Sequence, residues 1–339
     1  MKKLFLSMVA VMVATMSFAQ NTLVATLSHG DDITMFYGTF ALRDAMNAAQ
    51  SGDVINLSGG AFQAVNITKG ITLRGTGIDD AAPTYISGDF TINVPTDDAN
   101  RLSFEGIRST GTITMSGTFN SPYFVKSQFY AFKYNAPNIK NAMFANCKIT
   151  SEFKLNGKST VQFINSYVEA FYNNNESNTA ATFINCLIRP YTGSTGWSAN
   201  YYHPEYIINS QLLNCIIFNN YSSTQSNQLP SSTIASYCVS IQFANLFGAQ
   251  AANTNNKTAT FAELFKDFTG AYSESQAFEL TDEAKTKYLG NDGKQVGLYG
   301  GVLPYTSTPS YPQITKMNVA NKTTADGKLS VEIEVSAAE

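Results

Sequence analysis

Short apolar runs separated by glycine, asparagine and serine recur along the middle of the chain. The clearest run spans residues 183–188 and reads Phe-Ile-Asn-Cys-Leu-Ile, and similar runs lie about twenty residues away on either side. Aligned on one position, the runs contain Ile107, Ser127, Cys147, Ser166, Cys186, Cys215 and Cys238, at steps of 20, 20, 19, 20, 29 and 23 residues. A period near twenty with several short strands in each period is typical of a solenoid of β-strands.

In such a solenoid, successive coils stack ~4.8 Å apart in parallel register, so equivalent residues lie above one another. The repeat therefore predicts three internal columns. The aromatic column consists of Phe104, Phe124, Phe144, Phe163 and Phe183. The asparagine column consists of Asn146, Asn165, Asn185 and Asn214, and the column of small residues includes Cys147, Cys186 and Cys215. Asparagine tolerates the left-handed backbone of a tight bend, and stacked amides can hydrogen-bond along the axis.

The two ends of the solenoid carry other patterns. Residues 39–50 predict a helix capped by Thr39, with one apolar stripe that covers the open end of the strand stack. Phe261, Leu264, Phe265 and Phe268 have helical spacing and predict a short helix at the other end. The alternating residues 313–339 contain Asp-Gly and predict a β-hairpin, which we expect to dock on the solenoid or on a partner protein.

The first nineteen residues read as an export signal, with a basic start, an apolar run and a small-residue cleavage site before Gln20. The expected product is periplasmic, cell-surface or extracellular, with no transmembrane segment. The predicted division is residues 1–19 signal peptide, 20–52 lead-in strands and cap helix, 53–303 β-helix, 304–312 Pro-rich linker and 313–339 hairpin.

Charge and cysteine content narrow the possible partners. The net charge is −3, but residues 101–190 hold nine basic and four acidic side chains. That surplus either marks a solvated surface or forms a face that attracts anionic polymers such as uronate glycans. Basic clusters are missing, so no nucleic-acid partner is expected. The four cysteines follow the repeat, and parallel in-register side chains orient poorly for disulfides, so we expect buried free thiols. No metal site or cofactor is predicted, with calcium left open.

The Phe-x-Asn-Cys-x-Ile coils, the cap helix and the glycine-broken strands resemble the right-handed parallel β-helix of the pectin-lyase-like superfamily, and more narrowly secreted β-helix proteins of Bacteroidetes. The glycine-rich residues 293–301 are similar to the segment that often closes such helices. The resemblance covers residues 39–303 and implies an all-β, right-handed, single-stranded parallel β-helix with an N-terminal cap helix, followed here by the predicted hairpin tail. A leucine-rich horseshoe is the alternative, but its leucines are missing. The superfamily includes lyases, hydrolases, esterases, adhesins and binding proteins, so the resemblance implies no particular activity.

Candidate chemistry is sparse. Glycan hydrolysis needs paired carboxylates, and the lyases of this superfamily need clustered acids for calcium together with an Arg or Lys base. The Asp-Asp pairs at 31–32, 79–80 and 97–98 precede the clear coils, and the glutamates within the coils stand apart from one another. Lys126, Lys148 and Arg189 are expected to line a face, and a calcium-independent lyase using Lys or Arg with His203 stays open.

The 29-residue step before Cys215 indicates an insertion, which lies within residues 190–206. It contains the predicted ligand-binding residues Trp197, Tyr201, Tyr202, His203 and Tyr206. Sugar C–H faces stack on such rings, although the rings could instead cover exposed strands. The preferred hypothesis is a non-catalytic, exported β-helix that binds a polysaccharide or surface glycan or acts in adhesion. A divergent polysaccharide lyase or glycoside hydrolase and a structural or assembly component are the alternatives.

Overall fold

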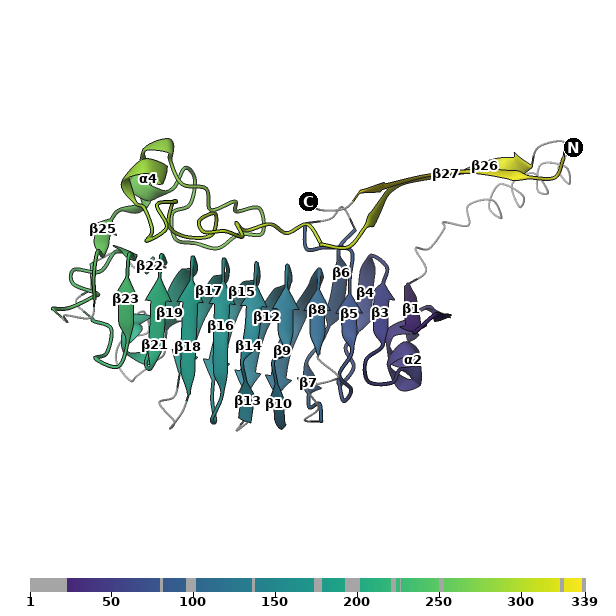
Figure 1. Cartoon of the computed structure of the whole chain (residues 1–339), viewed down its shortest axis with the longest axis horizontal. Helices are drawn as coiled ribbons and strands as arrows, with labels where there is room; N and C mark the ends of the chain where they lie inside the picture. The colour runs from purple at the N-terminus through teal and green to yellow at the C-terminus, as the bar shows by residue number, and fades with distance from the viewer. Residues whose placement is uncertain are drawn as a thin grey trace, which may run out of the picture.

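The computed structural model describes residues 23–79, 82–95, 102–135, 138–173, 179–192, 202–220, 224–225, 227–249, 253–323 and 326–336. These residues form a parallel β-solenoid with two long sheets that run the length of the molecule (Figure 1). In the first sheet, β2 and β1 are antiparallel, and the strands from β3 to β23 follow in parallel. The all-β parallel β-helix class is therefore confirmed. The predicted signal peptide lies outside the described residues.

Each coil contributes one short strand to the first sheet and one or two to the second. The first sheet contains β1 (Val24–His29), β2 (Asp32–Tyr37), β3 (Val54–Leu57), β5 (Thr72–Arg74), β8 (Ser103–Glu105), β11 (Tyr123–Val125), β14 (Ala142–Ala145), β16 (Thr160–Ile164), β18 (Ala180–Ile184), β21 (Ser210–Leu213) and β23 (Ile234–Ser236). The second contains β4 (Gly60–Gln63), β6 (Thr84–Ser87), β7 (Phe90–Ile92), β9 (Ile107–Met115), β12 (Gln128–Tyr134), β15 (Lys148–Leu155), β17 (Tyr167–Asn173), β19 (Leu187–Thr192), β20 (Tyr202–His203), β22 (Ile216–Phe218), β24 (Val239–Ile241) and β25 (Lys257–Ala259). A small third sheet pairs β10 (Thr118–Asn120) with β13 (Asn138–Lys140).

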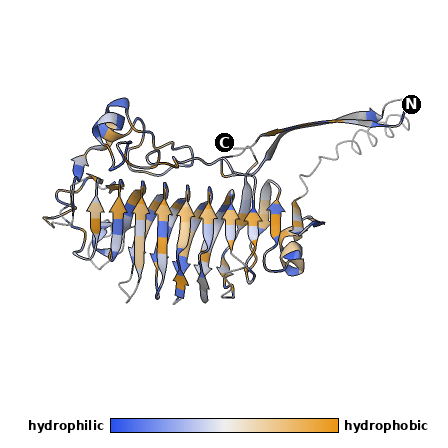
Figure 2. Ribbon diagram, in the orientation of Figure 1, coloured by the Kyte–Doolittle hydropathy of each residue, from blue (hydrophilic) through white to orange (hydrophobic). Residues whose placement is uncertain are grey.

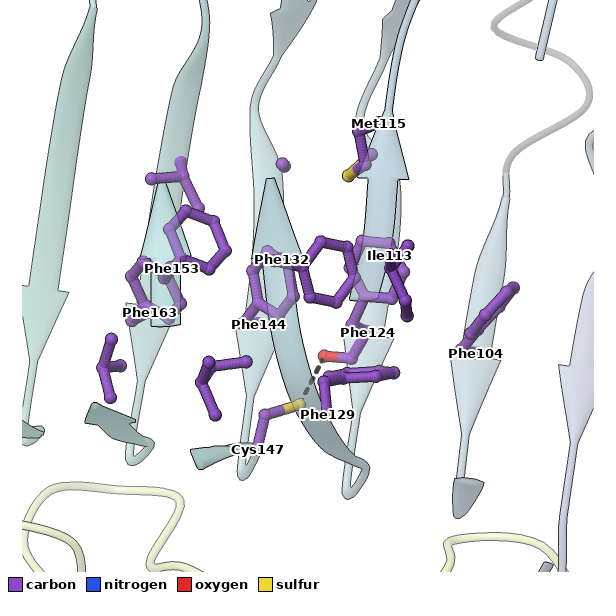
Figure 3. Packing of buried hydrophobic residues seen from close by; sticks show 14 of the residues in the cluster. Phe104, Ile113, Met115, Phe124, Phe129, Phe132, Phe144, Cys147, Phe153 and Phe163 are labelled. Carbon is purple, nitrogen blue, oxygen red and sulfur yellow. Dashed lines mark hydrogen bonds between the residues drawn. The ribbon is translucent and has the colours of Figure 1, made fainter. Parts of the chain in front are cut away.

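The predicted phenylalanine column is confirmed. Phe144, Phe163 and Phe183 are in parallel register and fully buried, and the last two rings stack at 5.0 Å. The second sheet supplies a facing set of phenylalanines that the repeat analysis did not identify. Phe153, for example, packs edge-on against Phe163 with ring centroids 4.9 Å apart. Figure 3 shows this interdigitation around Phe124, Phe132 and Phe144.

The asparagine column also has the expected backbone. Asn146, Asn165, Asn185 and Asn214 have φ between 45° and 57°, which is the left-handed region. Their side chains do not form the axial amide ladder suggested by the sequence. The Asn165 amide donates to the carbonyl oxygens of residues 298 and 300, and the Asn214 amide donates to the Asn291 side chain. These amides therefore fasten the C-terminal segment to the bend.

That segment, residues 261–312, crosses back over the coils, and we call it the strap. It contains α3 (Phe261–Leu264) and α4 (Asp282–Lys287), and its apolar side chains form a second core with Tyr167, Leu187 and Ile216 of the sheet. The predicted C-terminal helix is shorter than the spacing suggested, because Phe265 is already extended. The predicted linker, residues 304–312, belongs to the strap, since the Ser310 N–H donates to Glu105 Oε1 at 2.7 Å.

The two ends of the chain differ in exposure. Helix α2 (Ala41–Ala48) buries Leu42 and Met46 at the N-terminal end, and its N-cap is Phe40, with no side-chain hydrogen bond, rather than Thr39. Strands β26 (Gln313–Thr323) and β27 (Leu329–Ser336) pair as an antiparallel hairpin that extends away from the solenoid in the view of Figure 1. Figure 2 shows apolar residues concentrated in the strands of the solenoid, whereas α4 is mostly hydrophilic. None of the helices in the described ranges is long and apolar enough to cross a membrane.

All four cysteines are free and buried, as predicted. Burial raises the pKa of Cys147 to about 12, although hydrogen bonds with backbone groups of Ser127 and Ala145 oppose the shift. Since the thiolate is the reactive form, we expect no reaction of the native protein with a disulfide reagent at mildly alkaline pH. Full unfolding in guanidinium should release four reactive thiols, counted by absorbance. Rapid labelling of any thiol without denaturant would contradict the buried column.

Candidate functional site

Near the C-terminal ends of neighbouring strands in the twelve-stranded sheet, outward-facing side chains form a row across the sheet. In β15, Phe153 and Leu155 are buried, so Lys154 between them faces outward. Lys154 is in register with Lys133 of β12 and with Tyr172 of β17. The pairing of Phe171 with Pro190 then places Tyr191 beside Tyr172. We call Lys133, Lys154, Tyr172, Tyr191 and the adjoining Tyr206 the tyrosine–lysine ladder.

The three tyrosines of the ladder form a partly exposed aromatic surface. The ring centroid of Tyr172 lies 5.1 Å from that of Tyr191 and 4.7 Å from that of Tyr206. The rings of Tyr191 and Tyr206 are 5.9 Å apart and inclined at 71°. Each tyrosine is half-buried, so part of every ring stays open to solvent. A surface of this kind suits the C–H face of a sugar ring.

The insertion after β19 supplies the third ring. Residues 202–203 form β20 and pair antiparallel with β19, with His203 opposite Tyr191. The chain then enters the 3₁₀ helix η1 (Pro204–Tyr206), which brings Tyr206 onto the ladder. The backbone pairing fixes this arrangement, because β20 lies along β19 as an added antiparallel strand.

A cation is held beside the rings. The Lys154 ammonium lies 5.9 Å from the centroid of Tyr172 and 5.4 Å from that of Tyr191. Glu152 contacts this ammonium at 2.9 Å and the Lys133 ammonium at 3.7 Å. Burial lowers the pKa of Lys154, but the hydrogen bond and charge of Glu152 outweigh it and the net pKa is raised. Lys154 therefore remains a cation at neutral pH, with two tyrosine rings and one carboxylate as neighbours.

Two strands of the ladder, β17 and β19, also carry a buried polar cluster. The Glu169 carboxylate is paired with the Arg189 guanidinium and accepts a hydrogen bond from the Tyr167 hydroxyl. The Tyr202 hydroxyl donates to the Asn220 side chain and lies 3.5 Å from Arg189 Nη1. Burial raises the pKa of Tyr167 well above its usual range, and the nearby Arg189 only partly offsets this. The cluster joins β17, β19 and β20, which are the elements that position the tyrosines.

The structure separates the residues that the sequence grouped as a ligand-binding loop. Tyr202 and His203 are buried at 5% and 7% exposure, and His203 Nδ1 lies 2.7 Å from Glu205 Oε1. Tyr206 belongs to the ladder. Trp197 and Tyr201 lie outside the described residues.

Two ladder tyrosines, Tyr172 and Tyr191, were not among the predicted site residues. The signal for them was present, because they lie nineteen residues apart in the column that already contained Lys133 and Lys154. To find them, the inward and outward positions near the end of each second-sheet strand have to be assigned. No single residue type recurs there in every coil to align one coil with the next.

The basic residues that were expected to line one face lie in three different environments. Arg189 is paired with Glu169, Lys126 is buried at a left-handed bend, and Lys148 lies under the strap. Within the described ranges, no group of three or more His, Cys, Asp or Glu side chains is arranged to hold a metal ion.

No protein-family model matches this chain, and no curated protein matches it. Among solved structures, ORF18 of Geobacillus virus E2 is similar at 13% sequence identity with a TM-score of 0.33. The match covers 88% of this chain and 72% of that one. A likeness at this level supports no inference about function.

Proposed function

We propose that the protein is an exported, non-catalytic β-solenoid that binds a polysaccharide or surface glycan on the tyrosine–lysine ladder. The observation that carries this proposal is the cluster of three half-buried tyrosines, with ring centroids 4.7–5.9 Å apart, beside the Lys154 ammonium. Residues 1–19 support export, with the mature protein at the cell surface or in the surrounding medium.

The ladder suits an extended glycan chain. It crosses four neighbouring strands from Lys133 to Tyr191, a distance of roughly 15 Å at ~4.8 Å per strand, so a bound chain would run along the solenoid axis. The tyrosines offer stacking faces and hydroxyls, whereas the lysines offer donors to acidic or hydroxyl groups. The side chains stand on paired strands rather than on a free loop, so little ordering entropy opposes binding.

Alanine at Tyr172 or Tyr191 should reduce glycan binding by about tenfold or more, because each change removes a stacking face and weakens the packing of its neighbour. A panel of neutral and acidic polysaccharides, followed by affinity electrophoresis and calorimetry, measures the loss. Lys154→Ala should weaken the binding of acidic glycans more than that of neutral glycans, and it should reduce the salt dependence of binding.

Tyr130→Ala is the matched control, since Tyr130 is 49% exposed and makes no ring contact within the described residues. It should leave binding unchanged. If the Tyr172→Ala and Tyr191→Ala variants bound the glycan as tightly as the wild-type protein, the ladder would not be the binding site. Polysaccharide turnover, detected as unsaturated products or new reducing ends, would refute the non-catalytic assignment.

A further inference from the structure

The strap does not fit closely against the sheet along its whole length. Where it passes over the start of β15, a cavity of about 450 Å³ remains between the two layers. Lys148 forms its wall on the solenoid side and Asp79 lies at its edge, whereas Glu274, Tyr299 and Tyr305 come from the strap. The remaining lining is polar and consists mainly of Ser275, Gln276, Thr306 and Ser307.

One carboxylate of this cavity is already satisfied. Glu274 pairs with Arg108 at 3.0 Å through one oxygen and accepts from the Gln128 amide at 2.8 Å through the other. Asp79 lies 3.7 Å from Arg108 and 3.9 Å from Lys148, and it is 44% exposed. Arg108 is therefore committed to Glu274, and Lys148 is the cation of the cavity whose hydrogen-bonding capacity is unused.

Lys148 is only 3% exposed. Among the described residues, its ammonium has no hydrogen-bond acceptor; it lies 3.9 Å from Asp79 Oδ1 and 5.7 Å from the centroid of the Tyr305 ring. The Tyr305 hydroxyl is also buried without a hydrogen-bond partner in the described part of the chain. Unpaired buried donors are costly, the charged one most of all. Two such donors on one cavity favour a ligand that brings acceptor oxygens.

We propose that this cavity binds a small hydroxylated monocarboxylate, whose carboxylate accepts hydrogen bonds from Lys148 Nζ and the Tyr305 hydroxyl. Asp79 lies within ion-pair distance of the Lys148 ammonium but beyond hydrogen-bond distance, so the ligand supplies the acceptor oxygens that the ammonium lacks. A monoanion meets less repulsion from Asp79 and Glu274 than a dianion would. The volume exceeds that of acetate, and the serine and threonine hydroxyls along the strap are suited to ligand hydroxyls.

The charge state of the lysine is consistent with an incomplete site. Burial lowers the pKa of Lys148, and the charges of Asp79 and Glu274 oppose this shift without cancelling it. A bound carboxylate would bring a negative charge closer to the ammonium than Asp79 does. Because its partners come from both the strap and the sheet, the ligand would also hold these two layers together.

Isothermal titration of the full chain with gluconate tests the site, with sorbitol as the neutral counterpart and sulfate as the dianion. We expect saturable binding of gluconate and none of sorbitol. Lys148→Met should weaken gluconate binding by about tenfold or more, because a charge-assisted hydrogen bond is lost. Tyr305→Phe should weaken it by about threefold, since only a neutral hydrogen bond is removed.

Thermal unfolding shows that the variants are folded, and Lys148→Met should be at least as stable as wild type, since a buried ammonium without a hydrogen-bond acceptor is replaced by an apolar chain. Lys158→Met, at an exposed position, should leave the gluconate affinity unchanged. No heat with gluconate, equal binding of sorbitol, or unchanged binding by Lys148→Met would each overturn the proposal. Tyr172→Ala should bind gluconate normally, so the outcome is independent of the glycan ladder.

Discussion

Replacing Phe163 with alanine is expected to lower the free energy of unfolding by about 3–5 kcal/mol. Its ring is fully buried and lies 5.1 Å from that of Phe144, 5.0 Å from that of Phe183 and 4.9 Å from that of Phe153. Truncation would leave a cavity in both the axial stack and the edge-on contact between the sheets. The hydrogen-bonded strands on either side cannot move together to fill it, so little of the lost contact would be recovered.

Urea unfolding followed by tyrosine fluorescence and circular dichroism measures the effect. Tyr130→Ala removes a comparable aromatic side chain from an exposed position and should change stability by no more than about 0.5 kcal/mol. Because coils contact only their neighbours, loss of one central ring should also broaden the transition as the two halves uncouple. If both variants had the same midpoint and slope, the internal stack would not be a principal source of stability.

The internal columns were predictable because a solenoid repeats the same inward position in every coil. Once the period was known, parallel register placed Phe144 under Phe163, and the left-handed bend followed from asparagine at a constant offset. The strap follows no period, so its position could not be obtained in this way. Its contacts join residues such as Asn165 and Leu298, which lie 133 positions apart, and the sequence contains no local signal for that pairing.

The same difference between repeating and non-repeating positions explains which residues of the candidate site could be predicted. Lys133, Lys154, Tyr172 and Tyr191 occupy one column and could have been identified by extending the repeat to the outer face. Tyr206 arrives through an insertion whose path depends on antiparallel pairing between β20 and β19. The aromatic content of the insertion suggested one binding loop, but the backbone pairing buries Tyr202 instead.

The buried polar cluster of β17, β19 and β20 leads to the second prediction with a large effect. Arg189→Met is expected to destabilise the protein by about 3–5 kcal/mol, because it leaves the Glu169 carboxylate buried without its cation. Glu169 is 3% exposed, and its remaining partner is the Tyr167 hydroxyl. Lys154→Met is the matched comparison on the same sheet. Its partner Glu152 is more exposed and keeps Lys133, so we expect a loss below about 1 kcal/mol.

The double variant Glu169→Gln/Arg189→Met separates charge from packing. Glutamine still accepts from Tyr167 but carries no charge, so stability should return most of the way to wild type when measured by urea unfolding. If the double variant were as unstable as Arg189→Met, lost packing of the arginine stem would be the cause instead. Since Arg189 also adjoins Tyr202 of β20, the single variant should weaken glycan binding through Tyr206 even where the protein remains folded. The double variant should not restore that binding fully, because the contact between Arg189 and Tyr202 is still missing.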